Sequence, residues 1–216
     1  MKASRLLIVA GALCWLFAPA ATAGEARSLA NTLHTLRIHP DYPQYFQSPA
    51  GQPLLLIGDY TWGTFSDVDF DYQAQLDALK ASGLNFARVW LWWGCEQFPP
   101  PDDKLHFEPF LRPGPGTAND GRPKYDLSQF NPAFFDRLRV FCQAARERGL
   151  FLQLITVDAW MLKHTHLWKL HAFHRDNNVN GVDGDPRNTG NGIDGQQGFC
   201  SLGNPKALEF QKAYLR

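Results

Sequence analysis

The sequence has no excess of charge of either sign and no long apolar run, and each absence excludes a class of protein. Lys and Arg together number 21, as do Asp and Glu, so no basic surplus is present to hold a phosphate backbone and nucleic-acid binding is disfavoured. No apolar run reaches the roughly 18 residues that a membrane-spanning helix needs. The composition also excludes collagen, coiled coils and small disulfide-rich scaffolds. With 44% hydrophobic residues, the chain of 216 residues can bury a sizeable core.

The first 23 residues have the pattern of a bacterial secretory signal peptide. After a positively charged start, residues 6–17 form an apolar stretch, and Ala21-Thr22-Ala23 is an A-x-A cleavage site. A buried N-terminal helix is the alternative. We therefore expect a secreted or periplasmic protein, with a lead-in segment at residues 24–53 and one folded domain at residues 54–216.

Cysteine is scarce, and the expected mature chain has an odd number of cysteine residues. Once Cys14 leaves with the signal peptide, three cysteines remain: Cys95, Cys142 and Cys200. At least one of them is then unpaired within the chain. Cys95 and Cys200 fall in expected loops and could pair in an exported protein, whereas Cys142 lies on an expected helix as a buried thiol.

Strands and helices alternate along the rest of the chain. Three apolar runs are typical of buried strands: residues 54–57, 85–91 and 150–157. A helix is expected after each of them, starting at Asp69, at Asn131-Pro132 and at Asn204-Pro205. Gly83 and Gly149 mark the ends of the first two helices.

This alternation predicts right-handed βαβ crossovers and a parallel sheet. The loops that follow the second and third strands are long and irregular, at residues 94–129 and 158–203, whereas the turns after the helices are short. Long loops on one side are the pattern of a (β/α)8 barrel, or TIM barrel, whose working face is built from the βα loops. A doubly wound sheet is the alternative. Because a barrel needs about 250 residues, we expect about three βα units, the N-terminal and truncated portion of such a barrel.

Aromatic and charged residues collect where the expected strands end. Apart from Trp15 in the leader, every tryptophan lies at a strand end or in a loop, and none in an expected helix: Trp62, Trp90, Trp92, Trp93, Trp160 and Trp168. An aromatic-lined cleft suits the apolar faces of sugar rings. Four charged residues lie at the same places: Asp59, Arg88, Glu96 and Asp158. The alternative is that the tryptophans pack in the core and the charged groups form caps and salt bridges.

Arg88 lies inside the second expected strand, where a buried guanidinium needs a carboxylate partner. Side chains alternate along a strand, so Arg88, Trp90 and Trp92 share one face and the residues between them share the other. If Arg88 points into the barrel, the two tryptophans do so as well.

A group of histidines raises the question of a metal site. Four of them lie within 11 residues: His164, His166, His171 and His174. Asp176 then begins a run that resembles the first half of a calcium loop, but Arg187 stands where that loop needs a Glu. No strand or helix fixes the histidines, so we expect no metal and no other cofactor. The candidates for metal ligands are His164, His166 and Asp176, and a metal-dependent hydrolase using residues 164–174 is the second interpretation of the sequence.

Five segments together carry a resemblance to a known family: LRIHPDYPQYF (36–46), GQPLLLIGDYTWG (51–63), GLNFARVWLWW (83–93), GPGTANDGRPKYDLSQFNPAFFDRLR (114–139) and HAFHRDNNVNGVDGD (171–185). They resemble secreted bacterial cellulase-like glycoside hydrolases of the clan A barrel type. The resemblance implies a (β/α)8 barrel, a plant or bacterial polysaccharide or oligosaccharide as substrate, and no cofactor. It also implies that Arg88 supports the nucleophilic carboxylate.

In that family two carboxylates cleave the glycosidic bond, an acid/base Glu after the fourth strand and a nucleophile Glu after the seventh. Neither has a counterpart in this sequence, so the fragment is expected to be inactive and to carry binding residues. The expected substrate-binding residues are Asp59, Trp62, Trp92, Trp93, Glu96, Asp158, Trp160, His171, Asn177 and Asn178. A non-catalytic carbohydrate-binding barrel is the third interpretation.

Overall fold

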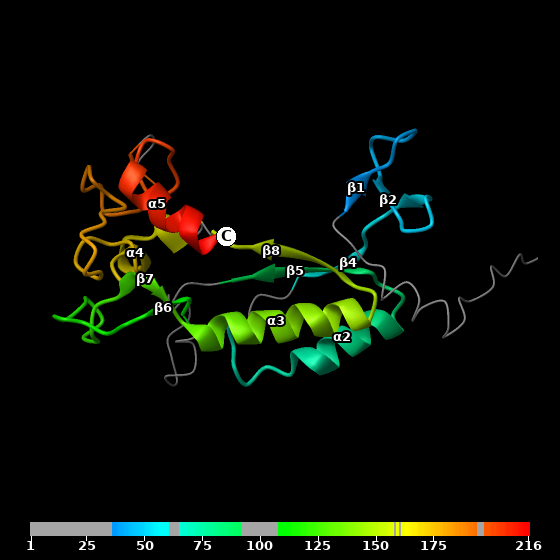
Figure 1. The fold of residues 1–216 in the computed structure, drawn as a ribbon, viewed down its shortest axis with the longest axis horizontal. Helices are drawn as coiled ribbons and strands as arrows, with labels where there is room; N and C mark the ends of the chain where they lie inside the picture. Colours follow the sequence, from blue (N-terminus) through cyan, green and yellow to red (C-terminus); the bar gives the residue numbers. More distant parts are fainter. Residues whose placement is uncertain (1–35, 61–64, 92–107, 158, 160, 194–196) are drawn as a thin grey trace, which may run out of the picture.

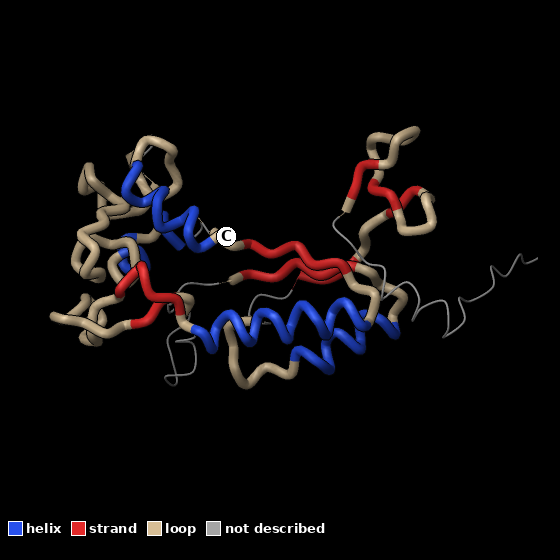
Figure 2. The backbone as a smooth tube through the Cα atoms, viewed as in Figure 1, coloured by secondary structure: helices blue, strands red, loops and turns tan. Residues whose placement is uncertain are grey.

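The protein is a mixed α/β structure built on a short parallel sheet. A computed structural model describes residues 36–60, 65–91, 108–157, 159, 161–193 and 197–216. The sheet has the order β4-β5-β8, with parallel pairs throughout, and its strands are β4 (Gly58–Tyr60), β5 (Phe86–Trp90) and β8 (Phe151–Ile155). The helices α2 (Tyr72–Ala81) and α3 (Pro132–Glu147) lie side by side beneath one face of it (Figures 1 and 2). The predicted parallel sheet of alternating strands and helices is confirmed.

Local sequence signals set the helix ends. Asn131 caps α3 by accepting a hydrogen bond from the amide of Ala133, and Pro132 occupies the first turn. Asn204 caps α5 (Pro205–Tyr214) in the same way, so both Asn-Pro starts are confirmed. The first helix begins later than predicted, because Asp71 and not Asp69 accepts the capping hydrogen bond, from the amide of Ala74.

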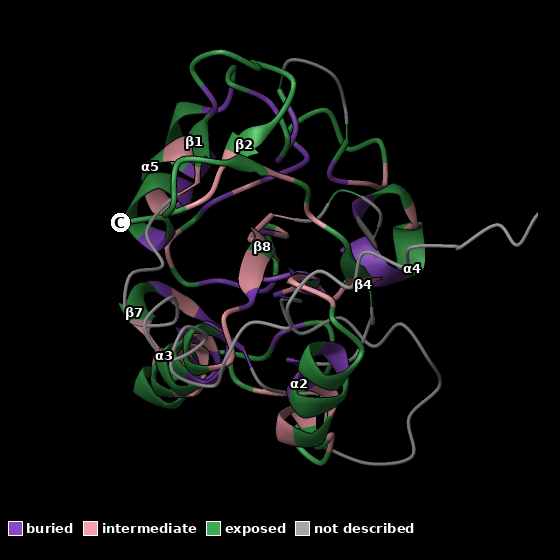
Figure 3. Cartoon of the chain, turned by 90° about the vertical axis from the view of Figure 1, so that its right-hand side faces the viewer, coloured by how far each residue is buried: buried purple, intermediate pink, exposed green. Residues whose placement is uncertain are grey.

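The core lies between the sheet and the two helices. On the helix side of β5, Ala87 and Val89 are buried, as strand alternation requires. Phe141 of α3 makes edge contacts with Phe65 and a tilted contact with Tyr72. Figure 3, viewed along the strands, shows how the outward sides of α2 and α3 are exposed. Each large apolar side chain buried in this core contributes about 1.5–3 kcal/mol.

The first predicted strand was placed too early in the chain. Leu54 ends β3 (Pro53–Leu54) of an antiparallel meander with β1 (Arg37–Ile38) and β2 (Phe46–Gln47), and the parallel pairing starts only at Gly58. The side chain of Asn85 explains the shift, since it accepts from the amide of Ile57 and donates to the carbonyl of Leu55. A side-chain amide thus occupies the backbone groups that a longer strand would have paired.

The two long loops contain regular structure that the sequence did not reveal. In the first, β6 (Phe110–Leu111) and β7 (Asp126–Phe130) form an antiparallel pair. The second contains the 3-10 helix η2 (Met161–Lys163) and α4 (Thr165–Trp168), so the expectation that no tryptophan lies in a helix is wrong for Trp168. Helices of three and four residues are too short to produce a periodic pattern. Both segments gather at the carboxyl ends of β5 and β8 (Figure 1).

Some sequence-based predictions concern residues outside the described ranges. The signal peptide and the site of its cleavage lie there, as does Cys95, so the pairing of Cys95 with the exposed Cys200 stays a prediction. Cys142 is half-buried, and burial raises the pKa of its thiol. None of the helices in the described ranges is both long and apolar enough to cross a bilayer.

Candidate functional site

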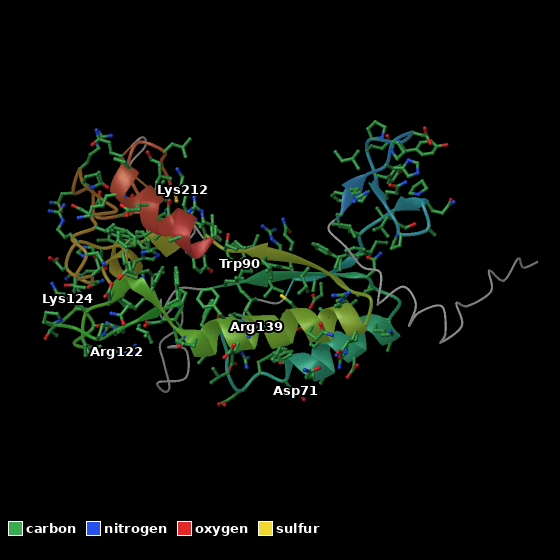
Figure 4. The ribbon with its side chains drawn as sticks, in the orientation of Figure 1. Asp71, Trp90, Arg122, Lys124, Arg139 and Lys212 are labelled. Carbon is green, nitrogen blue, oxygen red and sulfur yellow. The ribbon has the colours of Figure 1, made fainter. Side chains whose placement is uncertain are left out.

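The sheet face opposite α2 and α3 carries an exposed group of polar and aromatic side chains. Tyr60, Arg88 and Gln153 are neighbours in the register of the three strands, and all three are exposed. Trp90 follows Arg88 on the same face and is half-buried. Figure 4 shows Trp90 at the carboxyl end of β5. We call these four residues the open face.

The guanidinium of Arg88 lies beside two aromatic rings. Its guanidinium carbon lies 5.4 Å from the centre of the Tyr60 ring and 5.6 Å from that of Trp90, and the two ring centres are 6.0 Å apart. Such cation–π contacts contribute about 0.5–1 kcal/mol each at exposed sites. The carboxylate partner predicted for Arg88 is not found within the described ranges. The reason is that Arg88 is exposed, so water solvates the charge that a buried guanidinium would have to neutralise.

Asp59 lies on the opposite face of the sheet. Its register partner is Ala87, which is buried against the helices, and the amide of Gln75 in α2 donates to its carboxylate over 2.9 Å. Because Asp59 and Tyr60 are successive residues of one strand, their side chains point in opposite directions. The cleft predicted from the sequence required Asp59 and Arg88 to lie together. In the structure their side chains lie on opposite faces of the sheet.

The remaining predicted binding residues fall into two groups. Six of them lie outside the described residues: Trp62, Trp92, Trp93, Glu96, Asp158 and Trp160. The other three lie in the long loop after β8 and are buried: His171, Asn177 and Asn178. Their contact with a substrate stays a prediction, but the structure shows what each of the three does within the protein.

Asn177 and Asn178 hold the loop in shape through their side chains. Asn177 donates to the carbonyls of Lys169 and His171 and accepts from the amide of Asn119. Asn178 accepts from the amide of Val182 and donates to three backbone carbonyls, those of Ala172, His174 and Val182. A buried amide needs such partners because an unpaired polar group in the interior is costly.

Two further asparagines have the same function, and the sequence pattern did not identify them. Asn119 reaches from the first long loop to the second. Asn180 accepts from the amide of Leu127 and donates to the carboxylate of Asp126. Hydrogen bonds from Ser128 and Asn180 lower the pKa of Asp126 to about 2. The signal in the sequence is the recurrence of Asn beside Gly and Asp in both loops, a composition that is typical of turns and does not by itself indicate hydrogen bonds between the loops.

His171 is a core residue, packed among aromatic side chains. Its ring stacks on Trp168, with centres 5.2 Å apart, and meets Phe199 edge-on at 4.9 Å. Burial lowers the pKa of His171 to about 3, with a smaller effect from His174. Across the described residues, no group of three or more His, Cys, Asp or Glu side chains is arranged to hold a metal. The candidates His164, His166 and Asp176 therefore do not come together as a site.

A buried carboxylate in the first long loop was not predicted from the sequence. Glu108 is 4% exposed and accepts a short hydrogen bond from the hydroxyl of Tyr125. Arg112 lies 3.5 Å from it, stacks over the Tyr125 ring at 4.1 Å, and pairs with both oxygens of Asp120. Burial raises the pKa of Asp120, but the hydrogen bonds from Arg112 and from the amide of Arg122, together with the two positive charges, outweigh this effect and the pKa is lowered overall. These contacts fix the loop, and Glu108 lies in an irregular stretch whose sequence has no local pattern to reveal them.

Comparison with known proteins gives limited matches. Residues 101–188 match the model of a family described as a domain of unknown function, DUF6298. No curated protein matches the chain. One solved structure, described as that of a "putative glycoside hydrolase" from Bacteroides vulgatus, is similar with a TM-score of 0.42 and 19% identity. The match covers 51% of this chain and 22% of the other, so the matched half of this chain corresponds to about a fifth of that protein's length.

Proposed function

We propose that the described sheet is the N-terminal part of a (β/α)8 barrel of the glycoside-hydrolase type, and that its open face binds an oligosaccharide or polysaccharide. The observation that carries this proposal is the open face itself. It combines two aromatic rings and a solvated guanidinium on the sheet face that neither α2 nor α3 covers. In a barrel this face is the interior, and its carboxyl end is where ligands bind.

The chemistry of the open face suits a sugar. Aromatic rings offer a flat apolar surface to the C–H side of a pyranose, while a guanidinium offers several donors to hydroxyl oxygens. The neutral balance of charge disfavours nucleic acid as the alternative ligand. In the complete protein, two carboxylates would hydrolyse the O-glycosidic bond. Residues 1–216 supply no counterpart of that pair, so binding is the activity we propose for this chain.

Calorimetric titration with soluble gluco-, xylo- and manno-oligosaccharides tests the proposal. We expect Trp90→Ala to weaken binding by about 2- to 12-fold, because the contribution of one aromatic contact is about 0.5–1.5 kcal/mol. Trp90→Phe keeps a ring and should retain most of the affinity, which separates loss of stacking from loss of folding.

A matched control is Tyr42→Ala, which removes a 51% exposed ring from the lead-in meander. It should leave the affinity unchanged. If no oligosaccharide binds the folded protein, or if Tyr42→Ala weakens binding as much as Trp90→Ala does, the open face is not the sugar site.

A further inference from the structure

Two segments of the long loops are joined side by side through polar contacts. The hairpin segment is residues 117–125, and the histidine segment is residues 169–178. The amide of Asn119 donates to the Asn177 side chain over 2.8 Å, and the side chain of Asn119 donates to the carbonyl of Lys169 over 2.8 Å. The amide of Tyr125 donates to the carbonyl of Asn177, also over 2.8 Å. These contacts do not involve the open face.

One further contact between the segments depends on a proton. The side-chain nitrogen of Asn119 lies 3.2 Å from Nδ1 of His174. An amide NH2 group can only donate, so Nδ1 of His174 must accept and is unprotonated in this arrangement. The backbone amide of Asp176 also points at this atom, over 3.3 Å. The carboxylate of Asp176 lies 3.6 Å from the same Nδ1. If Nδ1 gains a proton, this carboxylate can accept a hydrogen bond from it.

We propose that His174 is an acid-sensitive latch between the two segments. Protonation at Nδ1 breaks the hydrogen bond that this nitrogen accepts from Asn119 and forms one that it donates to the carboxylate of Asp176. The hairpin segment is thereby loosened from the histidine segment. In the neutral state, Nδ1 accepts from Asn119 and holds the hairpin segment. In the protonated state, the N–H donates within the histidine segment and can no longer accept. One contact between the segments is then replaced by one within a segment.

Burial, together with the charges around His174, places the transition below the ordinary pKa of a histidine. Desolvation lowers its pKa, Asp176, Asp183 and Asp185 raise it, and Arg175 lowers it. The result is a pKa below the ordinary value of about 6.5. The buried His171 is neutral while His174 titrates, because burial lowers its pKa to about 3, and the adjacent Trp168 ring, with its centre 5.7 Å away, carries no charge. The latch is therefore closed at neutral pH and opens as the pH falls below the ordinary pKa of a histidine.

Amide hydrogen exchange, corrected for the intrinsic effect of pH, tests the latch on the complete chain. As the pH is lowered from about 7.5 to well below the ordinary histidine pKa of about 6.5, we expect exchange in residues 117–125 to rise about fivefold, the effect of losing one hydrogen bond. The measurement uses a His171→Phe background, which removes the global loss of stability that His171 causes as the pH falls, so exchange in α3 should change little. His174→Gln keeps an acceptor for Asn119 at every pH, so its hairpin segment should show no such rise.

Two more variants separate the latch from general acid unfolding. Asp176→Asn removes the negative charge that stabilises the protonated state and should move the transition to lower pH. His166→Gln changes an exposed histidine of the same loop and should behave as the unmodified protein does. An equal rise in α3, or an unchanged rise in His174→Gln, would overturn the proposal.

Discussion

Replacing Asn178 by alanine should destabilise the protein far more than replacing an ordinary loop asparagine. The side chain is 4% exposed and is the hydrogen-bond partner of the Val182 amide, the Val182 carbonyl and the Ala172 carbonyl. In Asn178→Ala these backbone groups lose their partner in the protein interior. Each unsatisfied buried group costs about 1–3 kcal/mol. Partial relaxation and entry of water reduce the sum, so we expect a loss of about 3–5 kcal/mol in the free energy of unfolding.

Urea denaturation followed by tryptophan fluorescence measures this loss, and Trp168 stacks on His171 in the same loop as a local reporter. Asn191→Ala is the matched control, because Asn191 is also a loop asparagine whose side chain accepts from the amide of Ile193 over two residues only. We expect that variant to lose under about 1 kcal/mol. The isosteric Asn178→Asp is expected to be at least as harmful as Asn178→Ala, since it directs an oxygen at three carbonyl oxygens.

The same experiment separates a structural role of Asn178 from the substrate-binding role that the sequence predicted. A structural residue lowers the free energy of unfolding when it is removed, and any change in sugar affinity then follows from loss of fold. A variant that unfolds at the same urea concentration as the unmodified protein but no longer binds oligosaccharide would refute the structural role and restore the binding role.

Two other predictions concern buried titratable groups. In His171→Phe, the aromatic contacts persist without a proton site. Because the native pKa of His171, about 3, is below the unfolded value of about 6.5, the unfolded state takes the proton first and stability falls as the pH drops through this range. From about pH 7 to about pH 5, the unmodified protein should lose about 2 kcal/mol more than the variant, measured by urea denaturation at each pH. In Tyr125→Phe, the buried Glu108 loses its hydroxyl donor, and thermal unfolding should show a loss of about 1–3 kcal/mol. A melting temperature equal to that of the unmodified protein would contradict this.

Features that depend on neighbouring residues could be predicted from the sequence. The alternation on β5 is one of them, since Val89 is buried and Arg88 exposed, as the strand geometry requires. The Asn131-Pro132 start of α3 is another, because the cap and the first turn lie within a few residues. Both signals act within one element and need no knowledge of what packs on it.

Features that depend on distant partners could not be predicted. The start of β4 is set by Asn85, whose side chain bonds to the backbone of residues 55 and 57. That partner lies 28 positions from Ile57 along the chain. The direction of the Asp59 side chain follows from the same register. No pattern within residues 54–60 records either fact, because Asn85 lies in a distant part of the chain, directly before β5.

The same limit applies to assigning polar residues to a site. In the sequence, Arg88 and Asn177 are equally good candidates, because each is a polar residue near the end of an expected strand or in the loop after it. In the structure, the amide of Asn177 is engaged by Lys169, His171 and Asn119, and little of its hydrogen-bonding capacity is left for a ligand. Among the described residues, the guanidinium of Arg88 meets the faces of two rings, and such contacts leave its N–H donors available to solvent or to a sugar hydroxyl. It is therefore this difference in satisfied hydrogen bonds, and not residue type, that makes the open face the better candidate.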